Sequence, residues 1–203
     1  MAGGKGASAK RRGRPAGAAR SDARERIVAA ARAEFGAHGY DRTSVRSIAK
    51  SAGVDSALVH HYFGTKDGVF AAAIESSFAP ALAGEQMIEG GPEGIGERLV
   101  RFFLGVWENP ETREPLLVIV RSALTAEPAA AALREFVSRE LLVRVAGQLS
   151  VPDPRLRAEL AASQMMGLAI LRYVLKVEPL ASADVETLVG LVAPALQRYL
   201  TEP

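Results

Sequence analysis

The chain has 203 residues, a composition typical of a soluble globular protein and a formal net charge of +2 at pH 7. This length allows one or two small domains with a real core. The sequence contains no cysteine, which excludes disulfides and cysteine-ligated metal or iron–sulfur sites. Its apolar runs are too short to span a bilayer, and its first residues lack the apolar segment of a secretory signal. We therefore expect a cytoplasmic protein with no membrane partner.

Charge is distributed unevenly along the chain. Residues 1–66 carry 13 Lys and Arg side chains against 5 Asp and Glu, a net charge of +8. Residues 67–203 carry 12 basic against 18 acidic side chains, a net charge of −6. A cationic third followed by an anionic remainder indicates a polyanion-binding head on a body with another role.

The first 20 residues contain six basic side chains, no acidic one and almost no large apolar one. They cannot bury enough surface to offset the entropy cost of ordering, so we predict a disordered basic arm over residues 1–20. Within the arm, Arg12-Gly13-Arg14-Pro15 is similar to the core of an AT-hook, whose arginines follow the minor groove of A·T-rich DNA. Arg12 and Arg14 are therefore candidate DNA contacts. The alternative is a basic tail that touches phosphates without sequence preference.

The first ordered helix is predicted from Ser21 to His38. Ser21 can cap its start, and Ile27, Ala31 and Phe35 fall at i, i+4 and i+8, which places them on one apolar face. A glycine at position 39 ends the helix, and the tyrosine that follows anchors the turn into the next element.

Residues 43–66 have the spacing of a helix-turn-helix. In the first short helix, Val45, Ile48 and Ala49 lie at i, i+3 and i+4 on one stripe. Gly53 can take the positive φ that a sharp turn between helices needs. Asp55 or the serine after it can cap the second helix, which in such motifs enters the DNA major groove.

A longer helix is predicted from residue 66 to 82, with Phe70, Ile74 and Phe78 at four-residue spacing and Pro80 near its end. It would join the head to the body. Glycines and a proline then mark residues 83–94 as a linker.

Prolines divide the rest of the chain into helical segments. These are predicted at 93–108, 115–125, 127–149, 152–177 and 182–199, and the pattern shows neither sustained strand alternation nor an internal repeat. The last two segments are apolar on more than one side, which requires two buried faces. We expect the second face to meet another copy of the chain in a two-fold dimer; a larger core within one copy is the alternative.

Residues 21 to about 81 resemble the N-terminal domain of the TetR family of transcriptional regulators. The resemblance is carried by Ile27, Ala31, Phe35, Gly39-Tyr40, Thr43-Ser44-Val45, Ile48-Ala49, Ala52-Gly53-Val54, Tyr62-Phe63 and Lys66. It implies an all-α chain with a three-helix DNA-binding domain over residues 21–81, whose helix-turn-helix spans residues 44–63. A helical effector-binding and dimerisation domain would then cover residues 82–203.

The resemblance also implies roles for single residues. The second helix of the motif should read bases, while Thr43, Ser44 and Lys66 should hold phosphates. The full set of candidate DNA contacts in the head is Thr43, Ser44, Arg46, Asp55, Ser56, Ala57, Leu58, His60, His61, Tyr62 and Lys66. Two positions depart from the family pattern: His60 stands where tyrosine is frequent, and Leu58 where a smaller polar residue is common. The operator preference of other members therefore does not transfer.

Enzymatic and metal-binding functions find little support in the sequence. It contains no Gly-rich phosphate loop, no Gly-x-Ser-x-Gly motif and no His–carboxylate cluster at metal spacing. His60 and His61 are adjacent on a helix and point about 100° apart, which does not suit a shared metal. We expect no catalytic residue, no metal and no cofactor.

In the body, apolar and aromatic side chains are candidates for a small-molecule pocket. They are Phe102, Phe103, Trp107, Met165, Met166 and Tyr173, each of which could equally be ordinary core. The hypothesis is a homodimeric repressor that binds a palindromic operator on double-stranded DNA and is released by a small apolar effector. The alternative is a ligand-independent DNA-binding module whose acidic body docks a protein partner.

Overall fold

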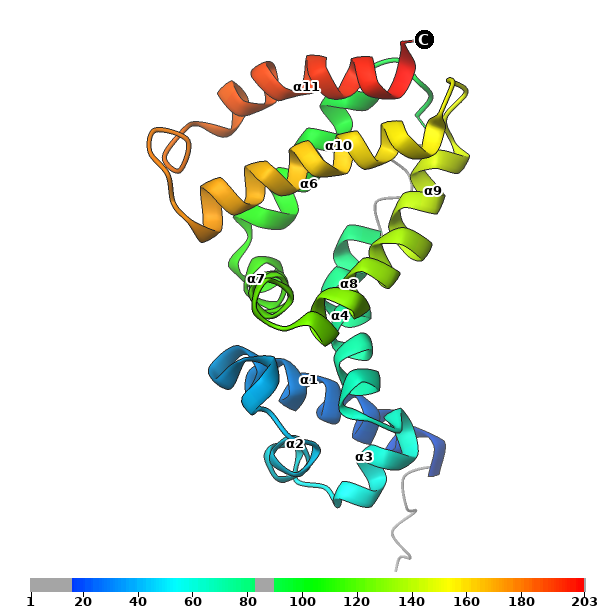
Figure 1. The fold of residues 1–203 in the computed structure, drawn as a ribbon, viewed down its shortest axis with the longest axis vertical. Helices are drawn as coiled ribbons and strands as arrows, with labels where there is room; N and C mark the ends of the chain where they lie inside the picture. Colours follow the sequence, from blue (N-terminus) through cyan, green and yellow to red (C-terminus); the bar gives the residue numbers. More distant parts are fainter. Residues whose placement is uncertain (1–15, 83–89, 203) are drawn as a thin grey trace, which may run out of the picture.

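The computed structural model describes residues 16–82 and 90–202, and within these ranges it contains helices and no strand. Figure 1 shows two parts joined by one helix, a lower head and an upper body. The elements are α1 Ala16–Arg42, α2 Val45–Ala52, α3 Ser56–Phe63, α4 Lys66–Leu82, α6 Ile95–Glu108, α7 Pro110–Thr125, α8 Glu127–Phe136, the π-helical turn η2 Val137–Leu141, α9 Leu142–Gly147, α10 Pro154–Ala169, the π-helical turn η3 Ile170–Val174 and α11 Val185–Thr201. The predicted all-α fold is confirmed.

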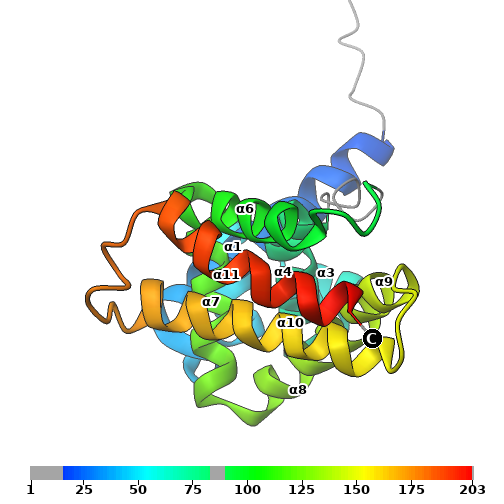
Figure 2. The same cartoon turned by 90° about the horizontal axis from the view of Figure 1, so that it is seen from above.

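The head consists of α1, α2, α3 and the first turns of α4, and α4 carries the chain up into the body (Figure 1). Seen from above, α6, α11 and α10 lie beside one another across the top of the body (Figure 2). Below them, α7 and α8 face the head, where α7 contacts α1 and both contact α4. The head and the body therefore meet through α4 and through an α1–α7 contact.

Two buried clusters form the core. The first runs without interruption from the head into the lower body, and includes Ile48 of α2, Phe70 of α4 and Leu116 of α7. The second lies between α6, α10 and α11, and includes Leu104 and Leu196. Because the first cluster crosses the boundary between head and body, a shift of α7 relative to α1 must repack side chains on both sides.

Several helix limits differ from those predicted from the sequence. The first helix begins at Ala16 rather than residue 21, since the alanine-rich segment before Ser21 has high helix propensity. The rest of the predicted disordered arm, with Arg12 and Arg14, lies outside the described residues. So does most of the predicted linker, because residues 83–89 are not described.

The prolines of the body act as helix starts more than as breaks. Pro110 occupies the first turn of α7, and Asn109 caps that helix by accepting a hydrogen bond from the Glu111 N–H at 3.0 Å. The helix predicted from residue 115 therefore starts five residues earlier. The helix predicted over 127–149 is divided by the π turn η2, and the last helix is capped by Asp184 rather than beginning at residue 182.

None of the helices in the described ranges has the length and apolarity that a membrane crossing requires.

Candidate nucleic-acid interface and pockets of the body

The turn between α2 and α3 is set by local caps at both ends. Ser44 and Ser47 form a capping box at the start of α2, with each side chain accepting from the other residue's backbone N–H, at 3.0 and 3.2 Å. Gly53 ends α2 at φ 65° and ψ 38°, and a Cβ there would meet nothing within 4 Å. The requirement for glycine is thus conformational and not steric. Asp55 then caps α3 by accepting from the Ala57 N–H at 2.7 Å.

One side of α3 is held in the head and the other faces outward. Val59 is buried against the first core cluster, and Leu58 and Tyr62 are half-buried. Ala57, His60 and His61 are exposed, and their i, i+3, i+4 spacing places them on one face. The helix α3 lies at the end of the head remote from the body (Figure 1). It has the position and length of a helix that could enter a major groove.

The two histidines on this face make different contacts within the chain. The Nδ1 atom of His60 lies 2.7 Å from the Gly64 carbonyl oxygen, and because a carbonyl only accepts, Nδ1 carries the proton. The Nε2 atom then points away from that bond and is available to a ligand. His61 packs against the ring of Tyr62, with 5.4 Å between ring centroids.

Thr43 and Lys66, which the resemblance predicts as phosphate contacts, make hydrogen bonds within the head. Thr43 is only 3% exposed, and its hydroxyl lies 3.1 Å from the Glu34 carbonyl oxygen and 2.8 Å from that of Gly39. Lys66 donates from Nζ to the Tyr40 carbonyl oxygen at 3.1 Å and lies 4.2 Å from the centroid of the Tyr40 ring. We therefore assign both side chains a structural role, because their polar groups are already engaged by the chain itself.

An aromatic cluster fixes α1 against α4. The Tyr40 ring stacks on Phe35 at 5.7 Å, and both rings meet the edge of Phe70 at 5.1 and 5.0 Å. The Tyr40 hydroxyl donates to Asp67. Burial and this bond to a carboxylate raise the pKa of Tyr40. The angle between the two helices that support α2 and α3 is thus set by packed rings.

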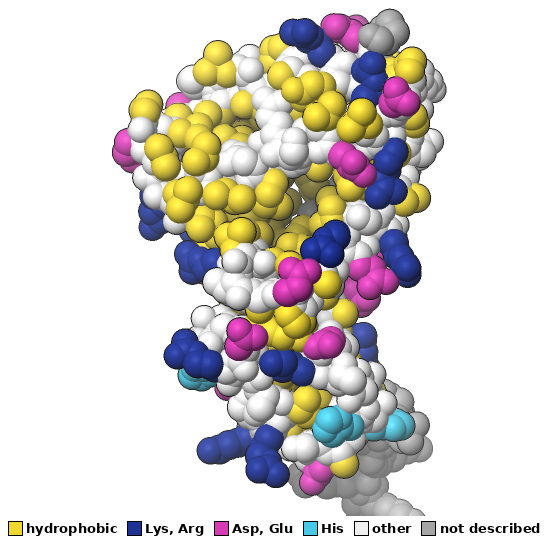
Figure 3. Space-filling view, viewed as in Figure 1, with side chains coloured by type: hydrophobic (Ala, Val, Ile, Leu, Met, Phe, Trp, Pro, Cys, Tyr) yellow, Lys and Arg dark blue, Asp and Glu magenta, His cyan; other side chains and the backbone are white. Residues whose placement is uncertain are grey.

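Two exposed cations of the head lie on α2. Arg46 and Lys50 are exposed and lie at i and i+4, so they share one face of this helix. Neither side chain makes a hydrogen bond or ion pair with another residue in the described ranges. Figure 3 shows Lys and Arg side chains beside the histidines at this end of the head. Lys50 was missed as a candidate contact from sequence, although its spacing from Arg46 signals it.

The six predicted ligand-binding residues of the body do not line one closed site. Trp107, Met165 and Tyr173 are buried, whereas Phe102, Phe103 and Met166 are half-buried. The Trp107 ring lies between Phe103, at 5.7 Å, and Tyr173, at 5.4 Å. Met165 belongs to the second core cluster instead. Figure 3 shows a hollow below α10, between α7 and α9, surrounded by apolar side chains.

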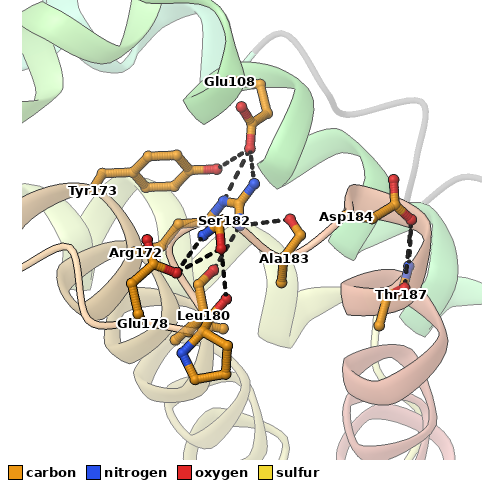
Figure 4. A network of polar contacts seen from close by, with 10 residues as sticks. Glu108, Arg172, Tyr173, Glu178, Leu180, Ser182, Ala183, Asp184 and Thr187 are labelled. Carbon is orange, nitrogen blue, oxygen red and sulfur yellow. Dashed lines mark hydrogen bonds and ion pairs between the residues drawn. The ribbon is translucent and has the colours of Figure 1, made fainter.

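A partly buried polar network lies where α6, η3 and the following loop meet (Figure 4). Arg172 donates to the Glu108 carboxylate from Nε at 3.0 Å and from Nη2 at 2.7 Å, and its Nη1 donates to the carbonyls of Leu180 and Ala183 at 2.7 and 2.9 Å. The Tyr173 hydroxyl donates to the same carboxylate at 2.9 Å. One guanidinium thus ties the end of α6 to the loop that leads into α11.

The network shifts the acidity of its members. Burial acts to raise the pKa of Glu108, but hydrogen bonds from Arg172 and Tyr173 outweigh it and hold that pKa below its ordinary value. Burial and the bond to Glu108 raise the pKa of Tyr173 to about 12. At neutral pH the carboxylate is therefore ionised and the phenol is neutral.

A pocket of about 400 Å³ opens beside this network. It is lined by Glu108, Arg113, Glu114, Leu117, Arg121, Arg172, Tyr173, Lys176, Glu178 and Ala181. Tyr173 is the one residue that this set shares with the predicted ligand-binding residues. The pocket is mainly polar, unlike the hollow below α10, and sequence reasoning missed it because its members come from segments far apart in the chain.

Comparison with known proteins assigns both parts of the chain. Residues 93–200 match the family described as Tetracyclin repressor-like, C-terminal domain, and residues 27–73 match Bacterial regulatory proteins, tetR family. The HTH-type transcriptional regulator BetI of Agrobacterium fabrum is 32% identical over 174 residues, covering 82% of this chain and 84% of BetI. The TetR-family regulator SCO0857 of Streptomyces coelicolor is 41% identical in its crystal structure, with a TM-score of 0.73, covering 93% of this chain and 98% of that one. The structure of SmeT in complex with triclosan is 22% identical with a TM-score of 0.64, covering 87% of this chain and 90% of SmeT.

Proposed function

Because the chain belongs to the TetR family of DNA-binding transcriptional regulators, we propose that it is a homodimeric repressor that holds its operator through α3 and releases it when a small apolar effector binds. The observation that carries this proposal is the exposed face of α3 formed by Ala57, His60 and His61. The face lies at the free end of the head and is flanked by exposed cations of α2. The proposed DNA-binding part is residues 21–81, and the proposed effector-binding and dimerisation part is residues 82–203.

The proposed contacts divide into base-reading and phosphate-binding groups. The methyl group of Ala57 can meet a thymine methyl, and His60 Nε2 and the His61 ring can reach base edges. Ser44, Arg46 and Lys50 are proposed to face the phosphates that flank the groove. Asp55 caps α3 and Tyr62 packs against the first core cluster, while Ser56 and Leu58 are proposed as further DNA contacts. Arg12 and Arg14 are proposed to reach the adjacent minor groove.

The proposed dimer interface is the outer surface of α10 and α11. Leu156 and Leu160 are 54% and 41% exposed at i and i+4 on α10, and Leu191 of α11 is 74% exposed. Apolar side chains gather over both helices in Figure 3. A second copy that packed the same surface would cover them all and would present two α3 helices to two half-sites.

The proposed effector site is the apolar hollow below α10. It lies beside α7, which contacts α1 of the head. At that contact a Cβ on Gly36 would lie 3.0 Å from a Val118 methyl, so the two helices approach closely. An effector that displaces α7 would therefore move α1 and change the distance between the two α3 helices. The family match over residues 93–200 favours this function over an acidic body that docks a protein partner.

DNA binding is tested on the full chain. Selection from random duplexes yields the operator, and fluorescence anisotropy then compares Arg46→Ala, Lys50→Ala and His61→Ala with Arg155→Ala, a matched exposed arginine at the far end of α10. We expect each α2 variant to weaken binding to all sequences and to lower the salt slope by about 1. We expect His61→Ala to lose about 1–3 kcal/mol on the preferred sequence alone. Equal affinities for all four variants would contradict the proposed interface.

The dimer is tested by sedimentation. Leu160→Asp and Leu191→Asp should each shift the chain towards monomer, because an unpaired carboxylate would be buried between copies. Leu124→Asp is the matched control, since Leu124 is 64% exposed on α7, away from α10 and α11. A dimer that survives both interface substitutions would place the two-fold contact elsewhere.

Release is tested by titrating the operator complex with a panel of small apolar compounds. The expected result is that the compounds that bind the chain also weaken its operator affinity. Binding of several compounds without any change in operator affinity would contradict the proposed release.

A further inference from the structure

The pocket beside Glu108 and Arg172 contains more cationic charge than its own acids neutralise. Four cationic and three acidic side chains line it. Glu108 is held by Arg172 and Tyr173, and the Glu178 carboxylate accepts from the Ser182 N–H at 3.3 Å and hydroxyl at 2.6 Å. These two acids are therefore already satisfied within the chain (Figure 4).

The cationic side chains of the pocket have fewer acidic or hydrogen-bond partners than its acids have donors. Arg172 is fully engaged by Glu108 and two backbone carbonyls. Arg113 has one acidic neighbour outside the network, Glu114, at 3.8 Å. The side chains of Arg121 and Lys176 make no hydrogen bond or ion pair with any residue of the described ranges. Two cationic groups thus face the pocket without a partner, and a third is only loosely paired.

The backbone at Lys176 is also unusual. Lys176 has a φ of 53°, in the left-handed region that glycine and asparagine adopt more readily. The strain is modest and a glycine would relieve it, yet the position holds a long cationic side chain that is exposed and lines the pocket. Three further lining residues, Arg113, Leu117 and Arg121, follow each other at i, i+4 and i+8 along α7. Leu117 therefore lies between the two arginines and gives the site an apolar wall.

We propose that this pocket binds a small organic anion, with its carboxylate or phosphate group between Arg121 and Lys176 and a compact apolar part against Leu117 and Tyr173. The volume of about 400 Å³ lies in the range of sites for small molecules. A planar guanidinium and an ammonium are the side chains that hold such oxyanions. The site is distinct from the apolar hollow. Anion binding to it can be measured without operator or effector, so its test is independent of the proposed function.

The chain contains a built-in probe for this site. Trp107 is the single tryptophan of the sequence. Its ring stacks on Tyr173, which lines the pocket, at 5.4 Å between centroids. Tryptophan fluorescence of the full-length chain, together with calorimetric titration, therefore reports on occupancy. The probes are benzoate, its uncharged analogue benzamide and inorganic phosphate.

We expect benzoate or phosphate to bind saturably and benzamide to bind at least about tenfold more weakly, because it lacks the charge. Arg121→Gln and Lys176→Gln should each weaken the binding anion by about tenfold or more, while Arg121→Lys keeps part of the affinity. A preference for benzoate identifies a carboxylate on an apolar body, and a preference for phosphate a phosphate ester. Both results support the anion site.

The matched control is Arg155→Gln, at the opposite end of α10 from η3 and exposed like Arg121. All these positions are on the surface, so their substitution should leave the thermal midpoint almost unchanged. The proposal is overturned if benzamide binds as well as benzoate, if Arg155→Gln weakens the anion as much as Arg121→Gln, or if neither anion binds at millimolar concentration.

Discussion

The head and the body are both built from helices, but different kinds of contact hold them in shape. In the head, the caps join residues two or three positions apart, and the Tyr40–Asp67 bond spans 27 positions. In the body, the polar contacts that fix the loop and the top helices span 64, 85 and 101 positions. The helix ends of the head are therefore fixed by residues that are close in sequence. The body depends on hydrogen bonds between residues that only folding brings together.

The largest effect is expected from the aromatic cluster of the head. Phe70 is fully buried and packs its edge against two rings. Phe70→Ala should lower the free energy of unfolding by about 3–5 kcal/mol. Urea denaturation of the full chain measures it, with Phe63→Ala, a half-buried ring of the same head, as the control that should cost less. Equal losses would mean that the cluster does not hold α1 against α4.

The next effect tests the long-range polar contacts of the body. Arg172→Ala removes a guanidinium that is 8% exposed, leaves two carbonyls without their donor and leaves Glu108 with only the Tyr173 hydroxyl. We expect a loss of about 2–4 kcal/mol, below the value for a fully buried pair because the Glu108 side chain is 40% exposed.

The matched control for this loss is an ion pair of similar geometry on the surface. Arg101 donates to both carboxylate oxygens of Glu186 at 2.6 and 2.8 Å, but it is 45% exposed. Solvent screens that pair, so Arg101→Ala should cost much less, and its effect should fall further with added salt. A salt-sensitive loss in Arg172→Ala, or equal losses in the two variants, would contradict the distinction.

A third effect concerns the close approach of α6 and α11. A Cβ on Gly96 would lie 2.4 Å from the Ala193 carbonyl oxygen and 2.6 Å from the Gln197 backbone nitrogen. Backbone atoms cannot yield alone, so Gly96→Ala must separate the two helices, at a cost of about 1–3 kcal/mol. Gly105→Ala on the same helix meets nothing within 4 Å and should stabilise the chain slightly. Thermal unfolding of the two variants should therefore move in opposite directions.

This difference between head and body also explains what the sequence could predict. The helix-turn-helix, its glycine turn and its caps are visible because each depends on residues a few positions apart. The common exposed face of Ala57, His60 and His61 depends on the same short spacing. For Thr43 and Lys66 the family positions predict phosphate contacts, whereas the burial of Thr43 and the carbonyl partner of Lys66 arise from tertiary packing that local spacing does not reveal.

In the body, the presence of the helices could be predicted from the sequence. Their π-helical interruptions and their tertiary contacts could not. The π turns η2 and η3 have no distinct sequence signal, since their residues are ordinary helix formers. Glu108 and Arg172 are single charges in an acidic body until folding places them together, and the pocket beside them is invisible for the same reason. The apolar periodicity predicted burial of Trp107, Met165 and Tyr173, but it could not assign Met165 and Trp107 to different clusters.

The smallest effect tests the same polar network through alkaline pH. Burial and the bond to Glu108 raise the pKa of Tyr173 to about 12, from an ordinary value of 10.0. The folded state thus keeps a proton that the unfolded chain loses. The resulting stability is complete below pH 10 and is lost as the pH rises through about 12. Relative to Tyr173→Phe, the wild-type chain should lose about 1 kcal/mol between about pH 9 and about pH 11, measured by urea unfolding. Tyr40 is present in both chains, so its own raised pKa cancels in the comparison. A constant difference between the two chains over this interval would mean that neither burial nor the bond to Glu108 raises the pKa of the Tyr173 phenol in solution.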